Sequence, residues 1–135
     1  MASSAGMAGA LAVGVGSALG GIARFWVAAA VNRRLGEAFP WGTLVVNVSG
    51  ALLAGALAAA LAAAGAPGTL EALLLIGFCG SYTTVSSFAL QTFSLAHAGR
   101  YARAAGNIAA TLVLTLACAW LGLEAGALLL GGGGA

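Results

Sequence analysis

Long apolar runs alternate with short polar segments along the chain. A hydrocarbon core of about 30 Å takes about 20 helical residues, so a run of that length can cross a bilayer as a helix. Four runs qualify, at about residues 7–31, 42–64, 70–96 and 104–130. The pattern predicts an all-α membrane protein, with residues 1–135 forming a single four-helix transmembrane domain and residues 131–135 (GGGGA) a flexible tail.

Composition supports this assignment. The 135 residues are 61% hydrophobic and 6% charged, whereas a soluble domain carries about 25% charged residues. The chain therefore belongs in the cell membrane as a multi-pass protein. Its net charge of +2 is too slight to indicate a nucleic-acid partner.

The arginines indicate an orientation. Arg33 and Arg34 lie in the first connection, and Arg100 and Arg103 in the third. The positive-inside rule places these two connections in the cytoplasm and both chain termini outside.

The three glutamates, Glu37, Glu71 and Glu124, lie at or near the ends of the predicted helices. Proton-coupled transporters usually depend on an ionisable group inside the membrane. Because all three carboxylates lie at or near helix ends, the sequence argues against a proton-coupled transporter.

The third run contains the segment GFCGSYTTVSSF, residues 77–88. Gly77 and Gly80, followed by a serine and two threonines, are poor at holding a helix. One reading is a third helix broken mid-membrane, which frees backbone carbonyls suited to a hard cation such as sodium. Protein or a cavity must then satisfy the freed groups. The other reading is a glycine-kinked helix packed closely on its neighbour.

Two further polar residues lie inside predicted spans. Arg24 either extends its side chain to the interface or attracts anions in a water-filled vestibule. Asn47 either joins two helices through its amide or offers two N–H donors to an anion.

In the fourth run, Asn107, Thr111 and Thr115 are spaced i, i+4, i+8 and form one stripe on a helix face. Such hydroxyls can bond their own backbone. Three polar residues on one face favour a polar track instead.

Three stretches, GSALGGIARF, WGTLVVNVSGALLAG and GFCGSYTTVSSF, together resemble the signature stretches of the Fluc-type fluoride channels, the CrcB family. The resemblance covers nearly the whole chain. It implies an antiparallel dimer with two narrow pores that export fluoride passively and relieve its toxicity. Such a protein is an ion channel and not an enzyme.

The resemblance also implies site residues. A structural sodium ion would be held at the dimer centre by the backbone carbonyls of Gly80 and Thr83. Arg24 would line the vestibule. The fluoride pathway would contain Asn47, Ser86, Phe88, Asn107, Thr111 and Thr115.

The chain departs from the family pattern at three positions of the third run. Val85 replaces a phenylalanine, Ala89 replaces a common serine, and Gln91 stands where a glutamate is frequent. In addition, every loop arginine favours one orientation, whereas a homodimer of opposed subunits needs a chain that inserts both ways. An alternative function is therefore a non-conducting or half-active subunit of a heterodimeric fluoride channel, paired with a related four-helix chain.

Overall fold

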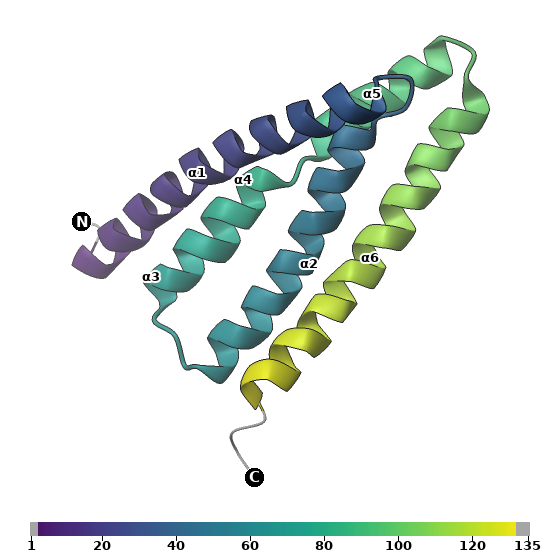
Figure 1. The fold of residues 1–135 in the computed structure, drawn as a ribbon. Helices are drawn as coiled ribbons and strands as arrows, with labels where there is room; N and C mark the ends of the chain where they lie inside the picture. Colours follow the sequence, from purple (N-terminus) through teal and green to yellow (C-terminus); the bar gives the residue numbers. More distant parts are fainter. Residues whose placement is uncertain (1–2, 132–135) are drawn as a thin grey trace.

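The computed structural model describes residues 3–131, which form helices joined by short connections (Figure 1). Four helical segments in this part of the chain are long and apolar enough to cross a membrane, at Ser4–Leu35, Trp41–Ala63, Gly68–His97 and Tyr101–Leu130. The predicted all-helical protein with four such helices is thereby confirmed. Of the expected C-terminal tail, Gly131 still belongs to the last helix, and residues 132–135 lie outside the described residues.

The first two helices are α1 (Ser4–Leu35) and α2 (Trp41–Ala63). Helix α1 begins where the Ser3 hydroxyl accepts a hydrogen bond from the Gly6 N–H, and it ends at Gly36, whose φ of 78° stops the helix. It extends beyond the apolar run 7–31 because capping residues and a polar last turn are invisible to an apolar pattern. The Asn32 Oδ1 then accepts the Gly42 N–H at 3.0 Å and ties the end of α1 to the start of α2.

The third segment consists of four pieces: α3 (Gly68–Glu71), the π-helix η1 (Ala72–Cys79), α4 (Gly80–Tyr82) and α5 (Val85–His97). Between α4 and α5 the backbone is extended, with φ/ψ of −78°/157° at Thr83 and −149°/125° at Thr84. The run of helical residues therefore stops at Tyr82, where the Thr83 N–H still donates to the Cys79 carbonyl oxygen at 3.1 Å, and begins again at Val85.

Helix α6 (Tyr101–Gly131) lies alongside α2 (Figure 1). The contact depends on glycines, because a Cβ atom added at Gly122 would collide with the Leu52 carbonyl oxygen, and one at Gly55 with that of Ala119. Gly126 meets the Ala56 carbonyl in the same way. Small residues let two helix backbones approach closely, which is how membrane helices commonly associate.

Helix α1 packs against η1 and α4 by the same means. A Cβ atom at Gly16 would collide with the Leu73 carbonyl oxygen, and one at Gly20 with that of Phe78. The glycine pairs Gly16/Gly20 in α1 and Gly122/Gly126 in α6, each spaced four residues apart, thus lie at helix contacts.

The outer surface is apolar. Large hydrophobic side chains such as Phe25 (71% exposed), Val85 (79%) and Leu129 (82%) face outward. The buried hydrophobic residues are few: Leu44, Val46, Cys79, Tyr82 and Ala104. So large an exposed apolar surface is unfavourable in water, so we expect lipid or another protein to cover it.

We expect Gly122→Ala to lower the stability of the protein by about 1–3 kcal/mol, because the new methyl group overpacks a backbone contact. Gly106→Ala in the same helix is the matched control, since a Cβ atom there meets nothing within 4 Å. Thermal unfolding in detergent, followed by size-exclusion chromatography, measures both. Equal midpoints for the two variants would contradict the close α2–α6 contact.

Candidate functional site

Asn47 and Thr84 form the polar centre of the structure. The Asn47 Nδ2 donates to the Thr84 carbonyl oxygen at 2.9 Å, and the Thr84 N–H donates to the Asn47 Oδ1 at 2.8 Å. Both side chains are buried, at 7% exposed each. An extended residue has no helical partners for its backbone groups, and buried backbone groups need partners. The Asn47 amide supplies both, so one of its two N–H donors is left free.

The same two hydrogen bonds affect the carbonyls next to the interruption. In a continued α-helix, the Thr84 N–H would bond the Gly80 carbonyl oxygen, but it is donated to Asn47. The Ser87 N–H would likewise bond the Thr83 carbonyl oxygen, but it is donated to the Thr84 Oγ1 at 3.2 Å. The carbonyls of Gly80 and Thr83 therefore both lose their usual helical donors.

A cluster of hydroxyls begins α5. The Thr84 Oγ1 lies 3.1 Å from the Ser86 Oγ and 3.3 Å from the Ser87 Oγ. A threonine whose side chain accepts an N–H three residues later is a favourable N-cap. The cap explains why a helix restarts directly after two extended residues.

A cavity of about 570 Å³ lies beside the interruption. Asn47, Phe88, Thr111 and Thr115 line it, together with Gly80, Thr83, Thr84, Val85 and three apolar or small residues of α2 and α6. Four of the six residues predicted for a pathway thus share one cavity with both residues predicted to offer carbonyls.

The other two predicted pathway residues, Ser86 and Asn107, are not among those that line this cavity. Asn107 is 1% exposed, and its Nδ2 donates to the Thr92 Oγ1 at 2.9 Å. Thr92 in turn donates to the Phe88 carbonyl oxygen at 2.7 Å. Asn107 thus links α6 to α5 behind Phe88, while Ser86 is exposed and contacts Thr84. The pathway roles of these two residues stay predictions.

The two threonines of the α6 stripe differ in their hydrogen bonds. The Thr115 hydroxyl donates to the Thr111 carbonyl oxygen at 2.6 Å, so its proton is used by its own helix. Both threonines line the cavity. The stripe therefore bonds its own backbone at Thr115 and contributes two threonines to a cavity wall, and the polar track stays a prediction.

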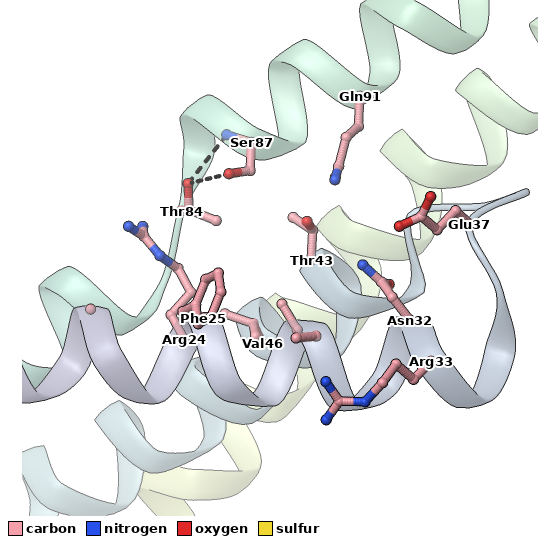
Figure 2. A pocket seen from close by; sticks show the side chains of 13 residues that line it. Arg24, Phe25, Asn32, Arg33, Glu37, Thr43, Val46, Thr84, Ser87 and Gln91 are labelled. Carbon is pink, nitrogen blue, oxygen red and sulfur yellow. Dashed lines mark hydrogen bonds between the residues drawn. The ribbon is translucent and has the colours of Figure 1, made fainter.

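A second cavity, of about 830 Å³, lies against α1 (Figure 2). Arg24, Asn32, Arg33, Glu37, Thr43, Ser87 and Gln91 are its polar and charged lining residues, along with Thr84. Arg24 is half-buried, and in Figure 2 its side chain points toward the Thr84 side of the cavity. The cavity is polar and partly cationic, and Thr84 lines it as well as the cavity of about 570 Å³.

Several of these residues were not anticipated from the sequence. Thr84, which joins both cavities, carries a weak local signal: a threonine three residues before Ser87 at the start of an apolar run, as in an N-cap. Tyr82 is held by the Ser49 hydroxyl at 2.9 Å and stacks on Phe78. No spacing rule connects Ser49 with Tyr82, because they come from different helices.

These features define a class of protein, namely a multi-pass membrane protein with polar cavities on two sides of an interrupted helical segment. A family model described as "CrcB-like protein, Camphor Resistance (CrcB)" matches residues 11–123. The chain belongs to the CrcB family.

Named relatives agree with the family match. A protein of Rhodopseudomonas palustris named "Fluoride-specific ion channel FluC 2" is 50% identical over 121 residues, which cover 87% of this chain and 92% of the relative. The "Fluoride-specific ion channel FluC" of Methylocella silvestris is 46% identical over 111 residues, covering 80% and 85%. That of Rhodospirillum rubrum is 41% identical over 126 residues, covering 91% and 97%.

We expect Asn47→Ala to destabilise the protein by roughly 1–3 kcal/mol, because it leaves the N–H and the carbonyl of Thr84 buried without partners. Asn107→Ala is the matched control. It removes an equally buried amide, but the Thr92 hydroxyl that it frees still bonds the Phe88 carbonyl.

Thermal unfolding of the purified variants in detergent compares the two. The expected order is a larger loss for Asn47→Ala than for Asn107→Ala. The opposite order would show that the Thr84 backbone does not depend on Asn47.

Proposed function

We propose that this chain forms a fluoride-selective ion channel that conducts fluoride passively across the cell membrane. It is not an enzyme. The observation that carries the proposal is the cavity shared by Asn47, Phe88, Thr111 and Thr115, in a chain of the CrcB family whose named relatives are fluoride-specific channels.

The chemistry of that cavity suits a small, strongly hydrated anion. Fluoride gives up water only where other donors replace it, and the free N–H of Asn47 and the Thr111 hydroxyl are such donors. The edge of the Phe88 ring carries partial positive charge and can face an anion. The lining contains no charged side chain, which favours conduction because an ion that binds too tightly leaves slowly.

The interruption at Thr83 and Thr84 is proposed to lie within the third membrane span. Extended backbone at that depth is tolerated where protein or a cavity satisfies its polar groups, and Asn47 and the adjoining cavity meet this condition. The carbonyls of Gly80 and Thr83, which lack their helical donors, are hard oxygen ligands suited to a structural sodium ion.

Two carbonyls from one chain are too few to enclose a cation, so a second chain is proposed to add its own pair. An antiparallel dimer with two pores brings the two interruptions together. Among the described residues there is no group of three or more His, Cys, Asp or Glu side chains that could hold a metal. Backbone oxygens are therefore the ligands on which this part of the proposal depends.

The identity of the second chain is a separate question. Val85 is 79% exposed and also lines the cavity of about 570 Å³, so a partner's side chains could complete the wall there. The one-sided arginines, Arg33, Arg34, Arg100 and Arg103, favour a single orientation of this chain. A homodimer and a heterodimer with a related chain of opposite bias both fit, and flux from the lone chain distinguishes them.

Purified wild-type protein in liposomes should release fluoride to a fluoride-selective electrode. We expect Thr115→Val to lower the rate several-fold while the elution profile of the protein is unchanged, because the variant removes an oxygen from the cavity wall and keeps the shape. Thr69→Val, an exposed threonine of α3, makes the same chemical change away from the cavity and should leave the rate unaltered.

Three results decide among the alternatives. Robust flux from the chain alone supports a homodimer. A silent wild type that Val85→Phe activates supports the half-active subunit of a heterodimer. Silence of both, with or without a related chain, would contradict the channel proposal itself.

Sodium removal tests the cation site. Replacing Na⁺ with N-methyl-D-glucamine should lower both the unfolding temperature and the fluoride flux, and restoring Na⁺ should recover both. Thr83→Val should keep this sodium dependence, because the proposed ligand is the Thr83 carbonyl and not its hydroxyl, which donates to the Cys79 carbonyl. Indifference of the wild type to sodium would rule the site out.

A further inference from the structure

The cavity that Arg24 lines shares residues with another cavity, of about 450 Å³, beside the connections that follow α1 and α5. Asn32, Glu37 and Gln91 line both of them. They come from α1, the first connection and α5, and in Figure 2 their side chains converge on one end of the larger cavity. We call this group of three the neck. Beyond it, the smaller cavity continues to Ser94 and Arg100.

The orientation of Asn32 in the neck is fixed. Its Oδ1 accepts the Gly42 N–H, and a Cβ atom at Gly42 would lie 2.6 Å from that oxygen. The Nδ2 group is therefore the part of Asn32 that remains available to the cavities, as a donor.

Gln91 brings an unpartnered polar atom to the neck. Its Oε1 is buried and has no hydrogen-bond partner among the described residues. A buried acceptor without a donor is costly, so a donor that enters from either of the two cavities that Gln91 borders would be favourable there.

Glu37 is the acidic residue that offsets the positive charge of the arginines around the neck. The charged residues that line the larger cavity are Arg24, Arg33 and Glu37. The smaller is lined by Glu37 and Arg100. Their formal lining charges are +1 (+2 − 1) and 0 (+1 − 1), so neutralising Glu37 would raise them to +2 and +1.

The other two glutamates are placed differently. Glu71 lines a separate cavity of about 180 Å³ near the second connection. Glu124 is not among the lining residues of the four described cavities. Both serve as controls for net charge.

We infer that the neck is the entrance by which a hydrated anion reaches the Arg24 cavity from the arginine-loop side, and that the Glu37 carboxylate restrains this entry. The inference rests on the proposed function. Anions that pass the neck meet Arg24 and then Thr84, which opens onto the cavity of about 570 Å³. Glu37 would thus set the local anion concentration at the neck. The donors of the cavity of about 570 Å³, Asn47 and Thr111, would then replace the water of the anion.

The test measures fluoride efflux from liposomes with wild-type protein, Glu37→Gln, Glu37→Asp, Glu71→Gln and Glu124→Gln. The background salt has an impermeant anion. At about 0.01 M ionic strength, Glu37→Gln should raise the flux about two- to fivefold, because removing a nearby negative charge raises the local anion concentration. At about 1 M the gain should largely disappear, since the screening length falls to about 3 Å.

The remaining variants make the outcome specific. Glu37→Asp keeps the charge and should conduct like the wild type, as should the variants of Glu71 and Glu124. Glu37 is exposed, so its substitution should leave folding intact. A conducting wild type with no salt-dependent gain in Glu37→Gln, or an equal gain in Glu71→Gln, would overturn the inference. A wild type without flux would instead count against the proposed function.

Discussion

Two hydrogen bonds between the Asn47 amide and the Thr84 backbone allow a helix to stop and restart inside an apolar protein. Extended residues leave their backbone N–H and C=O groups without helical partners, which is costly in an apolar environment. The Asn47 side chain has both an N–H donor and a C=O acceptor, so it bonds both backbone groups of Thr84. By engaging the Thr84 N–H, Asn47 also deprives the Gly80 carbonyl of its helical donor. The Asn47 side chain therefore satisfies the backbone of Thr84 and leaves the Gly80 carbonyl oxygen available for other ligands.

The hydrogen bonds between Asn47 and Thr84 can form because the surrounding helices pack closely. Glycines in α1, α2 and α6 put backbone against backbone where a methyl group would collide with a carbonyl oxygen. This packing brings α2 near enough for Asn47 to reach α5 across 37 residues of sequence. In a membrane, where burial of apolar surface gives little preference for one helix partner over another, such contacts supply much of the specificity.

Thr84 connects the structural role to the functional one. It lines the cationic cavity of Arg24 and the uncharged cavity of Phe88 and Thr115, so an anion moving between them would pass a residue whose backbone is fixed. The arrangement separates two tasks. Under the proposed function, long-range attraction would belong to the arginines of the cavity of about 830 Å³, and exchange of water for short-range donors to the cavity of about 570 Å³. Neither task alone would give a conducting and selective path.

The four apolar runs determined the number of helices and the membrane class, because hydropathy over about 20 residues reports the energetics of insertion without tertiary contacts. The motif segments likewise pointed to Asn47 and Phe88, and the stripe in the fourth run pointed to Thr111 and Thr115; these four residues share a cavity. Tertiary structure decided that Asn47 spends a donor on Thr84, that Asn107 faces α5 through Thr92, and that Asn32, Glu37 and Gln91 meet. These contacts join different helices, and no one-dimensional period encodes how helices that are apolar on most sides pack against one another.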